Sequence, residues 1–200
     1  MEQDEFIVLD YLDTFKLADE SFIEEDTGIE KSRLSEILTK LSEKGLIKRV
    51  NGQWQIEKAG EEEAKRYREK MLEESGRKNE VLEYCRKFEE LNVKFKELVT
   101  KWQMKEEDGM MVPNDHSDPE YDMAILEQLN VIHSETKKLL EKLSEILPIY
   151  KRYIPRFEKA LKLLMDGNIE YMDLDRQSYH NIWFELHESL LKLSGMKRVE

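Results

Sequence analysis

The chain has 200 residues, of which 40% are hydrophobic and 38% are charged, and its formal net charge is -12. This length allows one large domain or two modest ones, and the high charged fraction favours long amphipathic helices. The sequence shows no secretory leader and no apolar run near the 18 residues of a membrane span, so we expect a cytoplasmic protein without a membrane partner. The acidic balance excludes general attraction to nucleic acid, and DNA binding would need a local basic patch.

The N-terminal third has the element order of a winged helix-turn-helix. Gly45 follows a strongly amphipathic segment, as expected after the last turn of a helix. Asn51-Gly52 then separates two short runs rich in β-branched and aromatic residues, which is a strong hairpin signal. We therefore predict a winged helix-turn-helix domain over residues 1–65, with a small β-hairpin. Its expected elements are a helix over 6–15, a short helix over 22–26, a helix over 30–44 and a hairpin over 46–56.

The remainder, residues 66–200, reads as helical without a convincing strand. Residues 105–117 are predicted to be a loop, because they contain Gly109 and Pro113. Asp118 then resembles an N-cap followed by a proline at the first helical position. Inward apolar stripes and short connections favour an antiparallel helical bundle, so the fold class is mainly α. The expected helices cover 61–74, 81–102, 119–147, 155–164 and 175–193.

The single cysteine, Cys85, belongs to an apolar stripe that runs from Val81 to Trp102. It cannot form an internal disulfide, and its setting predicts a buried thiol in a reducing compartment. The stripe needs a helical partner. That partner is either the same chain or a second copy in a homodimer, and the pattern does not separate the two.

A local basic excess marks the second helix of the helix-turn-helix, the one that enters the major groove in such motifs. Residues 31–50 hold six basic and two acidic side chains, a balance of +4 within an acidic chain. Arg33 suits a guanine edge, and the other cations suit phosphates of double-stranded DNA. Glu36 in the middle of this face repels phosphate, and the alternative is a protein-contacting face with solvated cations. The predicted DNA-binding residues are Lys31, Ser32, Arg33, Ser35, Thr39, Lys40, Lys48 and Arg49.

Three short stretches of this region resemble the MarR-type winged-helix regulators. They are Leu46-Ile47-Lys48-Arg49, the Asn51-Gly52 turn and Ile56-Glu57-Lys58-Ala59-Gly60. The resemblance covers about the first 65 residues and implies a winged helix that binds DNA. The turn lacks the arginine that such regulators commonly carry at the tip of the wing.

A second group of polar residues lies on the apolar side of the predicted helix 175–193. Arg176, His180 and His187 share this side with Trp183, so each needs a hydrogen-bond partner. Asp115, His116 and Asp118 are expected to provide those partners. The group is then a buried polar network, a pocket for a small anionic effector, or a metal site. The predicted pocket consists of Asp115, His116, Asp118, Arg176, Tyr179, His180, Trp183 and His187.

The spacing of the candidate residues gives little support to a metal site or to an enzyme. His180 and His187 are seven residues apart, which places them about 10 Å apart along a helix, too far to share one ion without bending. The sequence has no glycine-rich phosphate loop and no nucleophile constellation. We therefore expect no cofactor, no metal and no enzymatic activity.

Longer motifs in the C-terminal part resemble a helical region found in proteins related to phosphoenolpyruvate-utilising enzymes. The motifs are Trp102-Gln103-Met104-Lys105, the segment 114–122 and the segment 178–188, and the likeness extends over most of 59–197. In those proteins the region accompanies a winged helix and a phosphohistidine swivelling domain. The swivelling domain is not part of this sequence, so the resemblance implies no phosphotransfer by this chain.

These observations favour a winged-helix transcriptional regulator, with a C-terminal helical domain for dimerisation or sensing. A homodimer would place two recognition helices on successive half-sites. The alternative is a non-catalytic accessory module that contacts a phosphoenolpyruvate-utilising enzyme.

Overall fold

The computed structural model describes residues 1–197, and most of them are helical. The N-terminal elements are α1 (Gln3–Phe15), β1 (Leu17–Ala18), α2 (Glu20–Thr27), α3 (Lys31–Glu43), β2 (Ile47–Val50), β3 (Gln53–Ile56) and α4 (Lys58–Glu74). They are followed by α5 (Lys78–Gln103), β4 (Met104–Glu107), β5 (Met110–Pro113), α6 (Pro119–Ile146), α7 (Tyr153–Met165) and α8 (Tyr179–Ser194). Short 3₁₀ turns cover Pro148–Arg152 and Ile169–Tyr171.

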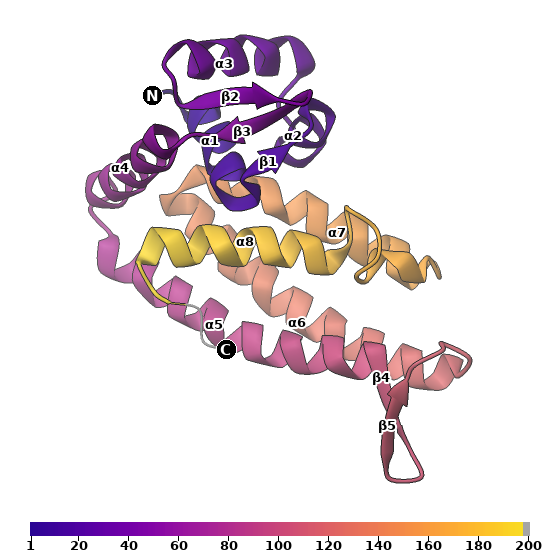
Figure 1. The fold of residues 1–200 in the computed structure, drawn as a ribbon. Helices are drawn as coiled ribbons and strands as arrows, with labels where there is room; N and C mark the ends of the chain where they lie inside the picture. The colour runs from indigo at the N-terminus through magenta and orange to yellow at the C-terminus, as the bar shows by residue number, and fades with distance from the viewer. Residues whose placement is uncertain (198–200) are drawn as a thin grey trace.

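The molecule is built in three tiers (Figure 1). We call residues 3–56, from α1 to β3, the N-terminal unit, and it forms the upper tier. Helices α7 and α8 lie beneath it, and the long α5–α6 pair forms the lowest tier. Helix α8 contacts α1 and α4 on one side and α5 and α7 on the other, so it joins the upper tier to the lower one.

The N-terminal unit contains the predicted helices and hairpin, within a three-stranded antiparallel sheet of order β1-β3-β2. Strands β2 and β3 pair through a two-residue turn, Asn51-Gly52, where both residues have positive φ. Such a turn matches the twist of paired strands, which explains the preference for Asn-Gly. Strand β1 was not predicted, because a strand of two residues is too short to show the alternation of apolar and polar residues. The inner side of α3 is buried through Leu34, Ile37, Leu38 and Leu41.

The helices of α5–α8 bury a core rich in aromatic side chains. Phe95 and Trp183 stack with ring centroids 4.2 Å apart, and the Trp183 Nε1–H donates to Asn92 Oδ1 at 3.0 Å. The stripe from Val81 to Trp102 is buried inside this core. Its packing partner is therefore the same chain and not a second copy. Cys85 is fully buried as predicted, and burial raises the pKa of its thiol to about 12.

Two predictions for the C-terminal part were wrong in detail. The expected loop 105–117 contains the β4–β5 hairpin, which turns at Asp108-Gly109 and projects from the end of the α5–α6 pair (Figure 1). The helix expected from Asp175 begins at Tyr179, because the Ser178 Oγ accepts from the Asn181 backbone and caps the helix there. The boundary predicted after residue 65 falls within α4, which is continuous from Lys58 to Glu74.

The coarse fold prediction, mainly α with a small antiparallel hairpin, is confirmed. Within residues 1–197, no helix combines the length and the apolar character that a membrane crossing needs.

Candidate functional site

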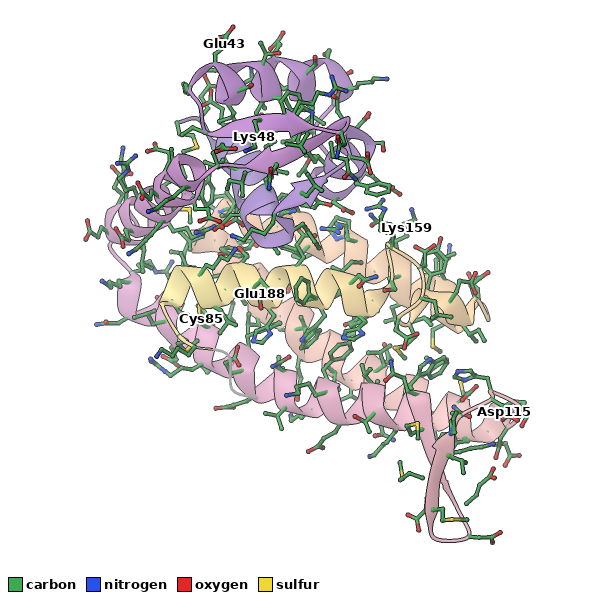
Figure 2. The ribbon with its side chains drawn as sticks, viewed as in Figure 1. Glu43, Lys48, Cys85, Asp115, Lys159 and Glu188 are labelled. Atoms are coloured by element: carbon green, nitrogen blue, oxygen red, sulfur yellow. The ribbon has the colours of Figure 1, made fainter. Side chains whose placement is uncertain are left out.

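The outer side of α3 is open to solvent. Helix α3 lies at the upper edge of the molecule, and Figure 2 shows Glu43 pointing outward from it. Arg33 is half-buried, whereas Lys48 and Arg49 on β2 are exposed. The predicted contact residues of α3 therefore share one accessible side, and those exposed there are Lys31, Ser32, Ser35, Thr39 and Lys40.

Carboxylates from the start of α1 lie against the cations of this side. Arg33 pairs with Glu2 and lies 3.8 Å from Asp4. Lys40 pairs with Glu5, and a Glu2 oxygen is 3.8 Å from its Nζ. Sequence reasoning missed these contacts, because they depend on how α1 packs on α3.

Glu5 is the anchored member of this acidic group. Its carboxylate is 1% exposed, accepts from the Glu2 backbone N–H at 3.4 Å, and lies 3.6 Å from Lys44 Nζ. Burial acts to raise the pKa of Glu5, but the hydrogen bond from Lys40 and the charge of Lys44 hold it below its usual value. Glu5 is therefore ionised at neutral pH and offsets positive charge on α3.

The cations of the β2–β3 hairpin are also engaged. Lys48 pairs with Glu57 at 2.6 Å. Arg49 lies over the Trp54 ring, 5.6 Å from its centroid, and its Nε donates to the Gly52 carbonyl at 3.3 Å. Four carboxylates from outside residues 31–50 thus contact this region and offset its excess of four positive charges; they are Glu2, Asp4, Glu5 and Glu57.

The residues of the predicted C-terminal pocket are distributed over separate places. Asp115 is exposed at the end of the α5–α6 pair, where it accepts from Lys105 at 3.0 Å (Figure 2). Asp118 caps α6 by accepting from two backbone N–H groups. His116 packs on Trp102, with centroids 4.5 Å apart, and its Nδ1 is 2.9 Å from Asp122.

The histidines of α8 have partners other than those predicted. His187 Nε2 is 2.6 Å from Glu89 Oε1 on α5, and Tyr179 OH is 3.3 Å from His133 Nδ1 on α6. His180 packs against Phe95, and burial lowers the pKa of its imidazole. The expectation that residues 115–118 provide the partners was wrong, because the facing sides of α5 and α6 lie against α8 instead.

Arg176 faces the N-terminal unit rather than the histidines. Its guanidinium contacts Asp26 at 2.6 Å, pairs with Glu25, and lies 4.4 Å from the Phe22 ring centroid. Arg176 precedes the first residue of α8, so the helical wheel that placed it beside His180 does not apply. The eight predicted residues therefore do not line one pocket.

A cavity of about 240 Å³ lies at this junction between the N-terminal unit and α7–α8. Arg156 lines it, with contacts of 3.1 Å to Asp26 and 2.7 Å to Glu185, and its Nε is buried without a hydrogen bond to residues 1–197. Only Arg176 belongs to the predicted pocket. The lining is otherwise mixed, with aromatic and aliphatic side chains beside the charged ones, and comprises Tyr11, Phe15, Leu17, Ala18, Phe22, Asp26, Arg156, Arg176, Asn181 and Glu185.

Comparisons with protein-family models, with curated proteins and with solved structures return no match for this chain. Its function must therefore be argued from the two features just described. One is the open side of α3 with its paired charges, and the other is the junction cavity with its two arginines.

Proposed function

We propose that the N-terminal unit is a winged helix-turn-helix that docks α3 into the major groove of double-stranded DNA, and that the protein is a cytoplasmic transcriptional regulator. The observation that carries this proposal is the accessibility of α3, whose hydroxyl and basic side faces solvent, away from α7 and α8. Ser32, Ser35 and Thr39 are suited to phosphate or base contacts there. Lys48 and Arg49 on β2 extend the same surface toward the wing.

The helical region would then dimerise and respond to a ligand. The buried stripe of α5 is not available for a dimer contact, so a homodimer must use another surface. A small anionic effector would enter the junction cavity and bind Arg176 in place of Glu25, whose side chain is 53% exposed. Because that cavity lies between the N-terminal unit and α7–α8, such a ligand would favour one relative placement of α3.

The decisive experiment is selection of bound duplexes from a random pool, followed by affinity measurements over a range of salt concentrations. Displacement of counterions by several phosphate contacts makes affinity fall steeply as salt rises. We expect Arg33→Ala/Lys40→Ala to weaken binding and to reduce the salt slope by about two, since each phosphate contact contributes about one.

A matched control removes the same charge elsewhere. Lys65 and Lys70 on α4 are exposed and pair with Glu69 and Glu74, so Lys65→Ala/Lys70→Ala changes the net charge equally. If both variants weaken binding to the same extent, α3 is not the docking helix. If no duplex is enriched, the regulator proposal fails.

The balanced charge of the α3 side favours a second candidate, a non-catalytic accessory module that contacts a partner protein such as a phosphoenolpyruvate-utilising enzyme. Phosphate binding depends on positive charge, so a surface whose charges are balanced attracts DNA less and leaves room for a protein partner. Two results together would support this candidate. The chain would form a stable complex with such an enzyme, weakened by Arg33→Ala, and it would enrich no duplex from the random pool.

A further inference from the structure

The start of α1 supplies the carboxylates that engage the cations of α3. Glu2 and Asp4 both approach Arg33, and a Glu2 oxygen is 3.8 Å from Lys40. Helix α1 packs directly on α3, so this proximity follows from the fold. The same two cations are those expected to bind phosphates if α3 docks DNA.

The acidic group has a fixed member and two adjustable ones. Glu5 is buried and held between Lys40 and Lys44, so it forms a permanent part of the surface. The side chains of Glu2 and Asp4 are 60% and 45% exposed. Exposed ion pairs are weakly held, because water competes for both charges. The ion pairs of Glu2 and Asp4 with Arg33 and Lys40 can therefore exchange with other anions.

We propose that Glu2 and Asp4 compete with DNA phosphates for Arg33 and Lys40, and so set the affinity of α3 for duplex DNA below the level that its cations alone would give. This inference rests on the proposed function. In the free protein these carboxylates pair with the cations in the way that phosphates would. In the complex Arg33 and Lys40 contact phosphates instead of Glu2 and Asp4. The two displaced carboxylates remain nearby and repel the phosphates.

Removing this competition should strengthen binding beyond the effect of net charge alone. The test compares wild type with Glu2→Gln/Asp4→Asn, using a mixed-sequence duplex of about 20 base pairs and fluorescence anisotropy. We expect roughly tenfold tighter binding at low salt, and a difference that shrinks as salt is added, because exposed charges are screened. The matched control is Glu69→Gln/Glu74→Gln on α4, which makes the same change in net charge.

A double-mutant cycle identifies the cations involved. In the Arg33→Ala/Lys40→Ala background, Glu2→Gln/Asp4→Asn should change affinity by no more than the α4 control does. A gain that persists in that background, or a gain equal to that of the control, would mean that only net charge matters and would overturn the proposal.

The outcomes also separate this inference from the proposed function. If wild type binds duplexes and Glu2→Gln/Asp4→Asn binds equally well, the competition is disproved and DNA binding stands. If wild type binds weakly and the variant binds strongly, both ideas are supported. If neither protein binds at any salt concentration, while circular dichroism shows both folded, both ideas fail.

Discussion

Two regions of this molecule use the same chemistry in opposite surroundings. On the side of α3, Arg33 pairs with carboxylates while its side chain remains 40% exposed. Between α1 and α4, Arg68 contacts Asp10 at 2.7 Å and Asp13 at 2.6 Å, with all three side chains no more than 7% exposed. Both regions place a guanidinium among carboxylates, but only the second does so out of reach of water.

This difference in burial decides what each cluster can do. The pairs that Glu2 and Asp4 form with the cations of α3 can exchange partners, since water replaces either charge at little cost. The buried cluster cannot, because removing one partner leaves an uncompensated charge in a poorly solvated place. It is also tied to α8, where Ser189 Oγ donates to Asp10 at 2.9 Å and Lys192 Nζ donates to the Asp13 carbonyl at 2.7 Å. One cluster is suited to binding, and the other holds the tiers together.

The largest expected effect comes from breaking the buried cluster. Arg68→Ala removes the guanidinium that contacts Asp10 and one of the three cations around Asp13, and it should lower the free energy of unfolding by about 3–5 kcal/mol. Denaturant unfolding followed by circular dichroism measures this change. Arg66→Ala, two residues away on α4, removes an exposed arginine paired with Glu63 and should cost only a small fraction of that loss. Equal losses in the two variants would refute the contrast.

The same variant should respond to pH in a definite direction. In the wild type, burial acts to raise the pKa of Asp13, but Lys16 and Arg68 hold it below its usual value. That stabilisation is present above the unfolded pKa of about 4 and is lost as pH falls through the folded pKa. Without Arg68 the buried Asp13 carboxylate takes up a proton more readily, which removes a charge that has lost one of its partners. The difference in the free energy of unfolding between wild type and Arg68→Ala should therefore be smaller at pH 4 than at pH 7. A difference that does not change with pH would contradict this account.

An intermediate effect is expected at His187, because the exposure of its partner Glu89 lies between the two extremes. Its side chain is 6% exposed, and that of its partner Glu89 is 25% exposed. His187→Ala removes the hydrogen bond and the contact with Phe88, and should cost about 1–3 kcal/mol in unfolding experiments. His180→Ala should cost less, because His180 is only half-buried. The reverse order would show that the contact with Glu89 contributes little.

The smallest effect is expected on the surface of α3. Arg33→Ala should leave the unfolding midpoint unchanged within error at physiological salt, since exposed pairs contribute little and are screened. A clear loss of stability would mean that the α1–α3 pairs hold the structure, and that they are not free to exchange with phosphate.

Helices that bury one side were predictable, as in α3, where four aliphatic residues recur at helical spacing. The β2–β3 hairpin was predictable because its turn requires residues that tolerate positive φ. The β4–β5 hairpin was missed although Asp108-Gly109 offers a similar turn. Its strands, Met-Lys-Glu-Glu and Met-Met-Val-Pro, contain a single β-branched residue, and the second ends in proline, so they carry little strand signal.

The site was less predictable than the fold. Sequence reasoning identified the cations of residues 31–50 but not their counter-charges, because Glu2 and Arg33 are separated by 31 residues and meet only when α1 packs on α3. It also placed His187 on the inward side of its helix but not beside Glu89, which lies 98 residues earlier. Local patterns report which side of a helix is buried, whereas partners across the molecule depend on tertiary packing.

The position of α8 bears on how the protein emerges from the ribosome. Ser189 and Asp10 are 179 residues apart, so at about 5–20 residues per second the N-terminal unit waits on the order of ten to forty seconds for the helix that covers it. An apolar surface exposed for that time would invite aggregation. Asp10, Asp13 and Arg68 instead present charges that water can solvate until α8 arrives. The ionic character of this junction therefore leaves charged groups, which water can solvate, where α8 will later pack.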